Sequence, residues 1–566
     1  MKYNLALCFL CIIGFVLRIY HLDSVPLWTD ESVHGNILNG FFLQNNSLIT
    51  KDNNGILYTF ISLAFVKIFG INEFGLRFGS VVFSTLSIPM IYRLGKQLFN
   101  QNIGLIAAFL TTFSFYLVFW GRIGRHYAIF EFFYLLVLFL FWKMWEISPY
   151  AQKNNHNTES QKVENPKTSI FTNNIIEIAQ NFGVYKLDFI VLIIGLFLCL
   201  LANRLTFFFV FSIGLYGSII AITQIIQKKN FCYSDKYAVL LYGNLLLYFL
   251  LLTQLAEYIL MIFMPYSHIY VFMPSLDYIL QKYNSMYRYD DFDIYYAVLS
   301  QDYIKYSFYK LGFIGFILAF FTENTQKYPE NNQENNHKSA IYLAVNFILP
   351  FLLMSFIFNY MSAERYIIYL YPLFLLSIAI TIYSVINLII KQIAYKILEN
   401  NIAISIIVVL LSIALFLVAP INDLQKLLTE DKYGVPHKKE LAKISFDDWR
   451  NACNYVKIKA KPQAVIMSLN TSLANFYFQK DNILQFSQFI YFKGELKQMP
   501  SDNGKIVNSY EAFMKLYNTK QEGWLILDSS FYNYYVDTNL REFIIKNLKQ
   551  HKASKDESVL VYSWNK

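Results

Sequence analysis

The stretch "SVPLWTDESVHGNILNGFF", residues 24–42, places two carboxylates and an imidazole within one helical turn of each other. Asp30 and Glu31 precede His34 by four and three residues, the spacings that bring side chains onto one helix face. A carboxylate held in this way can take a proton from a hydroxyl group. Thr29 or Asp30 can equally cap a helix, whose first turn favours acidic residues. The residues alone therefore predict either a capped helix start or a general-base site.

A second cluster, "RIGRHYAIFE" at residues 122–131, lies between two apolar segments. Its Arg122 and Arg125 carry planar guanidinium groups, which bind phosphate oxygens in pairs, and His126 follows them. The same residues are typical of a basic anchor on the cytoplasmic side of a membrane. The cluster thus predicts either a site for an anionic headgroup or a topological anchor.

Further arginines stand at the ends of apolar segments. Arg365 follows Glu364 in "NYMSAERYIIYLYP", Arg204 lies in "LANRLTF", and Arg77 follows Glu73 in "EFGLRFGS". Each of them can simply extend its charged end to the membrane surface while its methylene groups stay in the apolar layer. Several of them gathered on one side with an acidic pair would instead form an anion-binding site.

The composition is that of a membrane protein. Of the 566 residues, 55% are hydrophobic and 15% are charged, against about 25% charged residues in soluble domains. Several apolar runs approach the roughly 20 residues that span a bilayer, so we predict a polytopic α-helical membrane protein. The first run lacks the small-x-small cleavage site of a signal peptide, so we predict that it is a retained helix. The five cysteines have no zinc-type spacing, and the net charge of +9 is spread over loops, which argues against nucleic-acid binding.

Hydropathy indicates twelve candidate spans. They cover about residues 3–20, 56–70, 76–94, 102–120, 126–146, 188–203, 205–226, 237–263, 306–322, 339–360, 365–390 and 400–419. Lys2 predicts a cytoplasmic N-terminus, and the basic segments 228–236 and 391–396 predict cytoplasmic loops, which places the acidic pair and the tail outside. That arrangement needs an odd number of crossings. Because the run 56–70 is short, we predict eleven or thirteen.

The chain divides into a membrane module, residues 1–420, and an extracytoplasmic α/β domain, residues 421–566. In the latter, "DDWRNACNYVKIKA" and "NLREFIIKNLKQ" have helical periodicity, with Asp447 or Asp448 near the start of the first. "AVIMSL", "GWLILD" and "SVLVYSW" are short runs with β-branched residues and predict strands. Within the module, residues 21–55 form the first external loop. The tyrosine-rich stretch 264–305 forms another, either a lid that stacks on a sugar or an aromatic belt.

The order of these segments resembles that of the GT-C-type glycosyltransferases, in particular the protein O-mannosyltransferases and the aminoarabinose transferase of lipid A. The resemblance lies in the acidic pair after the first span, followed by "GILYTFISLAFVKIFGINEFGLRFGSVVFSTLSIPMIYRLGKQLF", "GLIAAFLTTFSFYLVFWGRIGRHYAIFEFF" and "SAERYIIYLYPLF". It covers about residues 1–390. One departure is "DNNGILY" at residues 52–58, where relatives often have a Gly-Pro or Pro-Pro pair.

The resemblance implies an enzyme that moves a sugar from a polyprenyl-phosphate donor to a lipid, glycan or protein acceptor, with inversion at the sugar carbon. Asp30 would be the general base, with Glu31 beside it, and neither a metal nor another cofactor would be needed. The substrate-binding residues would be His34, Lys51, Tyr58, Arg122, Arg125, Arg204 and Arg365. The positive charges of the lysine and the arginines among them would stabilise the leaving phosphate.

Two other interpretations stay open. One is a transporter or flippase-associated protein for lipid-linked saccharides, although no internal repeat of the kind common in transporters is visible. The other is a non-catalytic scaffold with the same fold. The expected location is a bacterial inner membrane, where membrane lipids surround the chain, since no eukaryotic targeting or retention signal is visible.

Overall fold

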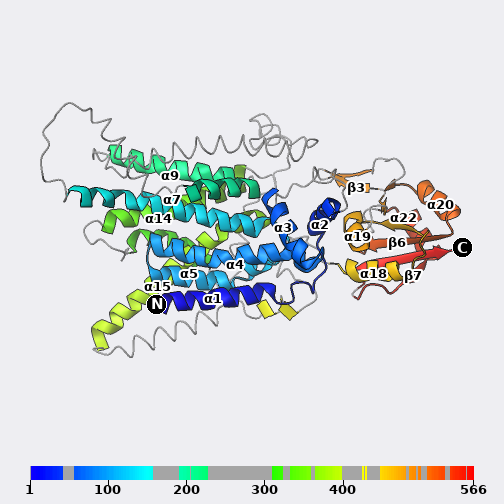
Figure 1. Ribbon diagram of the computed structural model, residues 1–566, viewed down its shortest axis with the longest axis horizontal. Coiled ribbons are helices and arrows are strands. Elements are labelled where there is room, and N and C mark those ends of the chain that lie inside the picture. The colour runs from blue at the N-terminus through cyan, green and yellow to red at the C-terminus, as the bar shows by residue number, and fades with distance from the viewer. Residues whose placement is uncertain are drawn as a thin grey trace.

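The computed structural model consists of a bundle of long helices and, beyond one end of it, a C-terminal sheet region (Figure 1). The structure describes residues 2–42, 56–156, 190–203, 206–226, 309–322, 332–357, 364–397, 424–425, 428–429, 447–479, 483–487, 489–492, 495–498, 506–529, 536–555 and 557–566. The predicted spans 237–263 and 400–419 and the tyrosine-rich stretch 264–305 lie outside these residues.

The helices of the bundle coincide with predicted apolar segments, apart from α2, which carries the acidic pair. Their bounds are α1 Lys2–Ile19, α2 Thr29–Phe42, α3 Ile56–Phe69, α4 Glu73–Leu98, α5 Gln101–Phe113, α6 Phe115–Gly121, α7 Tyr127–His156, α9 Thr206–Ile226, α13 Tyr309–Leu318, α14 Asn332–Leu352 and α15 Tyr371–Ile397. A further apolar helix spans Ile190–Ala202. The 3₁₀ segments η2 (Ala319–Phe321) and η5 (Glu364–Leu370) and the π segment η4 (Leu353–Ile357) adjoin α13, α15 and α14.

Short polar side chains set where several helices begin. Asn72, Asn100 and Ser114 each accept a hydrogen bond from the N–H three residues further on and so cap α4, α5 and α6. Such a cap satisfies an N–H group that has no partner within the helix. Ser114 also ends α5, and the two helices that meet there are bent by 60°. The predicted span 102–120 is therefore a broken helix pair.

The described residues contain three helices that are long and apolar enough to cross a membrane, Glu73–Leu98, His337–Ser355 and Arg365–Leu388. Counting the bent pair Gln101–Phe113 and Phe115–Gly121 as one span gives a fourth. The other apolar helices are shorter, among them Tyr3–Ile19 and Leu57–Phe69. The total of eleven or thirteen crossings stays a prediction, because two of the candidate spans are not among the described residues.

The C-terminal region, residues 447–566, is built on a six-stranded sheet in the order β5-β2-β1-β6-β8-β7. The strands are β1 Val465–Ser468, β2 Leu484–Phe486, β5 Ile506–Val507, β6 Glu522–Asp528, β7 Lys549–His551 and β8 Val559–Asn565; β3 Phe489–Phe492 and β4 Glu495–Gln498 form a separate pair. β5, β2, β1 and β6 are parallel, whereas β8 pairs antiparallel with β6, and β7 pairs antiparallel with β8 at the edge of the sheet. The three predicted strands are β1, β6 and β8.

In the described part of this region, four helices accompany the sheet: α18 Trp449–Lys459, α19 Thr471–Phe478, α20 Tyr510–Thr519 and α22 Thr538–Asn547. Of the two predicted candidates, Asp448 is the cap of α18. One apolar cluster joins the two regions, because it contains Leu27, Leu38 and Leu76 of the bundle end as well as Trp449 and Phe476. The end of the bundle that carries α2 therefore shares a core with the C-terminal region.

Candidate active site

Helix α2 carries the acidic pair and lies between the end of the bundle and the C-terminal region (Figure 1). Asp30 and Glu31 are in its first turn, where negative charge interacts favourably with the helix dipole. Their surroundings nevertheless differ, because Glu31 is fully buried whereas the Asp30 side chain is 35% exposed. Two adjacent carboxylates can therefore serve different purposes.

Glu31 forms a closed set of hydrogen bonds inside the protein. Arg77 of α4 donates to both carboxylate oxygens, from Nε and Nη2, over 2.8 Å each. The backbone N–H groups of Trp28 and Gly124 donate to the same oxygens over 3.0 and 2.6 Å. Arg77 is also buried, and it donates further to the carbonyls of residues 22, 25 and 26. Because its charge is paired and hydrogen-bonded on all sides, Glu31 fixes the loop that leads into α2.

Asp30 faces Arg125, which lies in the turn between α6 and α7. Asp30 Oδ2 is 3.5 Å from Arg125 Nη2, and Arg125 Nη1 donates to the Asp30 carbonyl over 3.2 Å. The Arg125 side chain is 11% exposed, so the pair lies at the edge of the protein interior. A carboxylate with a third of its surface exposed can be reached by the hydroxyl group of an incoming molecule, as general-base catalysis requires.

Arg365, at the start of η5, completes this group of charges. Its guanidinium carbon lies 5.0 Å from the centre of the Trp28 ring and 5.4 Å from that of Tyr366. Arg125 approaches the same indole at 6.0 Å and Tyr127 at 5.9 Å. Cation–π contacts of this kind orient a guanidinium without using its N–H groups. The Arg365 Nε is buried and has no hydrogen-bond partner among the described residues, so it can still donate to an anion.

The turn at residues 122–125 positions three parts of this site. Arg122 is fully buried and donates to the carbonyls of residues 17, 18, 20 and 21, so it caps the C-terminal end of α1. Gly124 supplies an N–H to Glu31, and a Cβ at this position would lie 3.1 Å from the nearest carboxylate oxygen and from the Tyr58 hydroxyl. The Arg125 carbonyl accepts a hydrogen bond from the Ser80 hydroxyl, which fixes the backbone at Arg125. The geometry favours a structural role for Arg122.

His34 of α2 and Tyr58 of α3 pack against each other. Both are fully buried, and their ring centres are 4.4 Å apart. The Tyr58 hydroxyl donates to the Leu76 carbonyl over 3.2 Å. His34 is therefore a buried residue of the bundle end and not a polar residue of the surface.

Two predicted binding residues, Lys51 and Arg204, lie outside the described residues. Sequence reasoning did not select Trp28 at all and weighed Arg77 only as a weak signal. The aromatic residue immediately before "TDE" and the arginine in "EFGLRFGS" are the signals that could have found them. In the part of the chain that the structure describes, no three His, Cys, Asp or Glu residues gather as a group that could hold a metal ion.

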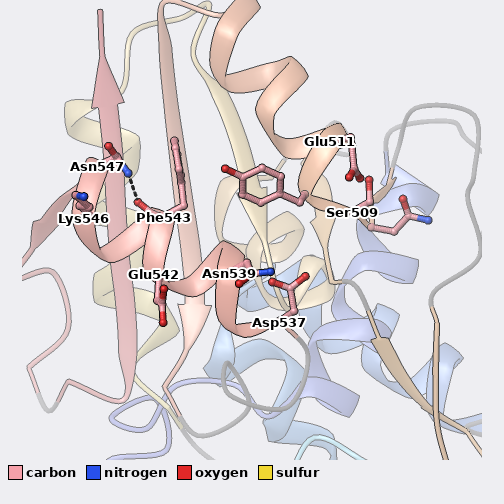
Figure 2. Close-up of a pocket in the computed structure, with 10 residues that line it drawn as sticks. Ser509, Glu511, Asp537, Asn539, Glu542, Phe543, Lys546 and Asn547 are labelled. Carbon is pink, nitrogen blue, oxygen red and sulfur yellow. Dashed lines mark hydrogen bonds between the residues drawn. The ribbon is translucent and has the colours of Figure 1, made fainter.

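A cavity of about 820 Å³ lies in the C-terminal region, between α20 and α22 (Figure 2). Figure 2 shows the carboxylates of Glu511, Asp537 and Glu542 around it, with Lys546 on the α22 side. Asp537 caps α22 through the Leu540 N–H. None of the predicted site residues lines this cavity, so the candidate active site remains at α2.

A family model of known proteins matches part of the helical bundle. Residues 53–155 match the family model of the dolichyl-phosphate-mannose-protein mannosyltransferases. This match includes Tyr58, Arg77 and the turn at residues 122–125, but not the acidic pair itself. Among curated proteins, none matches the sequence significantly.

Solved structures match almost the whole chain. ArnT from Cupriavidus metallidurans bound to undecaprenyl phosphate superposes with a TM-score of 0.57 and 12% sequence identity, covering 99% of this chain and 97% of ArnT. The apo state of the same protein gives a TM-score of 0.57 and 11% identity over the same shares. At such low identity the likeness concerns the fold. The chain has a GT-C-type membrane fold, which confirms the resemblance predicted from its sequence.

Proposed function

We propose that this chain is a membrane glycosyltransferase that transfers a sugar from a polyprenyl-phosphate-linked donor to a hydroxyl-bearing acceptor. The observation that carries the proposal is the partly exposed Asp30 carboxylate beside the guanidinium groups of Arg125 and Arg365. The GT-C-type fold and the mannosyltransferase match support it, as does the undecaprenyl phosphate that ArnT binds.

In the proposed reaction, Asp30 removes the proton from the acceptor hydroxyl as its oxygen attacks the anomeric carbon of the sugar. The bond between that carbon and the phosphate oxygen breaks, and polyprenyl phosphate leaves with the bonding electron pair. Attack from the side opposite the leaving group inverts the configuration. The products are the glycosylated acceptor and polyprenyl phosphate, and the proton passes from Asp30 to solvent.

The arginines supply the charge that the leaving group needs. Phosphate gains negative charge as it departs, and guanidinium groups fixed beforehand stabilise it without reorganising. Arg365 is held by the Trp28 and Tyr366 rings. Arg125 is held by the Asp30 carbonyl and by the rings of Trp28 and Tyr127. We include Arg125 and Arg365 in the phosphate site, with Lys51 and Arg204 as further candidates from the sequence. We assign Arg122 and Glu31 to positioning.

The proposed topology follows from the position of α2. Because α2 and the C-terminal region lie at the same end of the bundle (Figure 1), both belong on one side of the membrane, and we propose the extracytoplasmic face of a bacterial inner membrane. Residues 1–420 would then be the membrane module and residues 421–566 an extracytoplasmic domain. The acceptor, a lipid, a glycan or a protein, would approach Asp30 from that side.

The test is turnover of a labelled polyprenyl-phosphate sugar by the purified protein, followed as release of polyprenyl phosphate. Asp30→Asn is expected to lower kcat at least about a hundredfold, the usual contribution of a general base. Asp23 is an exposed acidic residue of the segment between α1 and α2, so Asp23→Asn is the matched control and should turn over like wild type. Equal turnover in Asp30→Asn would contradict the assignment. Movement of intact donor across liposomes without cleavage would favour a transporter instead.

A further inference from the structure

One side of α2 is bound by the C-terminal region through polar groups. Thr29, Ser32 and Asn36 are spaced three and four residues apart, so they share a helix face. Asn470 Nδ2 donates to Thr29 Oγ1 over 2.9 Å. The Ser472 carbonyl accepts from Asn36 Nδ2 over 2.8 Å, and the Ser32 and Ser472 hydroxyls are 2.9 Å apart. All of these contacts come from the cap and the first turn of α19.

Asn470 contacts the starts of two helices with one side chain. Its Oδ1 accepts from the Leu473 N–H over 3.2 Å and caps α19, while its Nδ2 reaches Thr29, the residue next to Asp30. The position of α19 is thereby transmitted to the start of α2. A shift of either helix relative to the other would break the hydrogen bond between Asn470 and Thr29.

Apolar packing continues the same contact along α2. Gly35 faces the Phe476 ring so closely that a Cβ there would lie 2.5 Å from a ring carbon. Leu38, Leu76 and Phe476 belong to one buried cluster together with Trp449. Any side chain at position 35 would have to push α19 away from α2, so the close approach of the two helices depends on this glycine.

A third group of contacts joins the C-terminal region to the start of α4. Arg450 Nε donates to Glu73 Oε1 over 2.7 Å, and the Tyr477 hydroxyl donates to the same oxygen over 3.0 Å. The Tyr477 hydroxyl accepts in turn from the Leu27 N–H over 2.8 Å. Burial raises the pKa of Tyr477 well above its usual value, and Glu73 raises it further, so the phenol stays protonated and keeps donating to Glu73.

The opposite side of α2 is held by the bundle through the Glu31–Arg77 pair and the His34–Tyr58 contact described above. Asp30 is thus a partly exposed residue in a first turn that is fixed from both sides. Reactions that depend on a positioned group are sensitive to displacements of about 1 Å, which can cost about a hundredfold in rate. The C-terminal contacts act on the residue next to the proposed base.

We propose that the C-terminal region is a positioning part of the membrane active site: Asn470 and Ser472 hold the first turn of α2 so that Asp30 faces Arg125 and Arg365. This inference rests on the proposed function, because it concerns the same site. Asn470 and Ser472 contact no substrate in this scheme. They act through α2.

The variants isolate the Asn470–Thr29 contact. Asn470→Ser keeps a good helix cap for α19 but is too short to reach Thr29. Thr29→Val removes the acceptor oxygen while preserving the side-chain shape, and Thr29→Ser retains it as the matched control. We expect Asn470→Ser and Thr29→Val to lower kcat about tenfold, with donor KM within about twofold of wild type, because only the geometry of the reacting group changes. Thr29→Ser should resemble wild type.

A double-mutant cycle distinguishes positioning from general destabilisation. If Asn470 acts through Asp30, Asn470→Ser should change the residual turnover of Asp30→Asn by less than about twofold. A merely structural role would lower that residual turnover by the same factor as in the wild-type background. Hydrogen exchange adds a measurement that needs no activity: amides of α2 should exchange faster in Asn470→Ser, while those of β1 and β6 should not change.

The outcomes separate the two proposals. If Asp30→Asn is as active as wild type, the proposed function fails and the inference fails with it. If turnover depends on Asp30 but Asn470→Ser has wild-type kcat, only the inference is overturned. The same holds if the losses of kcat in Asn470→Ser and Asp30→Asn multiply in the double mutant. Unchanged exchange in α2 also overturns it. Reduced kcat, non-additive coupling and faster exchange confined to α2 would support it.

Discussion

Arg77 binds both carboxylate oxygens of Glu31 through Nε and Nη2 over 2.8 Å each, and both side chains are completely buried. The adjacent carboxylate, Asp30, is partly exposed and 3.5 Å from a different arginine, Arg125. One acidic pair is thus divided between a structural contact and a reactive position. This division leads to separate predictions for stability and for turnover.

Glu31→Gln is expected to destabilise the protein, because it leaves the buried Arg77 charge without its counterion. Breaking such a pair costs about 3–5 kcal/mol. Asp30→Asn removes only a partly exposed ion pair and should cost at most about 1 kcal/mol. Thermal and denaturant unfolding of both variants in detergent, followed by tryptophan fluorescence, checks this difference. If Glu31→Gln unfolds like wild type yet loses turnover, Glu31 takes part in the reaction.

Arg122 and Arg365 are predicted to behave in opposite ways when each is replaced by methionine. Arg122→Met leaves carbonyls at the end of α1 without donors, and each buried unsatisfied group costs about 1–3 kcal/mol. Arg365→Met should unfold close to wild type but raise the KM for the donor about tenfold, since hydrogen bonds to charged groups contribute about 1.5–3 kcal/mol. Unfolding curves and donor titration together decide the case. A stable Arg122→Met with weak donor binding would return Arg122 to the binding site.

Gly35→Ala should weaken the contact between α2 and α19, because its Cβ would lie 2.5 Å from the Phe476 ring. Overpacking of this kind usually costs about 1–3 kcal/mol. Gly217→Ala is the matched control, since a Cβ at Gly217 meets nothing within 4 Å. Unfolding free energy and kcat should both fall for Gly35→Ala and stay near wild type for Gly217→Ala. Equal behaviour of the two variants would show that α2 can move away from α19 at no cost.

The C-terminal region should lose stability at acidic pH through His551. Burial, together with the charge of Lys549, lowers the pKa of His551 below its ordinary value of 6.5. The folded state then binds this proton less readily than the unfolded state, so the contribution is fully present above pH 6.5 and is lost as the pH falls through the folded-state pKa. The imidazole lies between the Tyr455 hydroxyl, 3.0 Å from Nδ1, and the Ser563 hydroxyl, 2.7 Å from Nε2.

Trp524 provides the measurement for this prediction, because its ring centre is 4.9 Å from that of His551. Unfolding followed by tryptophan fluorescence should give a higher midpoint at pH 7.5 than at pH 5.5. His551→Gln should reduce the difference between the two midpoints. A midpoint in wild type that rises toward acidic pH would contradict the sign of the effect.

Much of the local structure could be predicted from the sequence. The apolar runs indicated the helices of the bundle, and the β-branched runs indicated β1, β6 and β8, because hydropathy and periodicity depend on near neighbours. The span 102–120 was an exception. Its central Ser114 caps a second helix, so the backbone bends by 60° within an otherwise continuous apolar run.

The candidate site was predicted only as a set of residue types. By itself the sequence determined that an acidic pair follows the first apolar helix, that arginines stand at the ends of others, and that an α/β region comes last. The tertiary structure decided which of these charges are buried. Arg77 meets Glu31 across 46 positions of the chain, and Asn470 meets Thr29 across 441. No local pattern encodes such partners, because burial and pairing arise only when distant segments pack together.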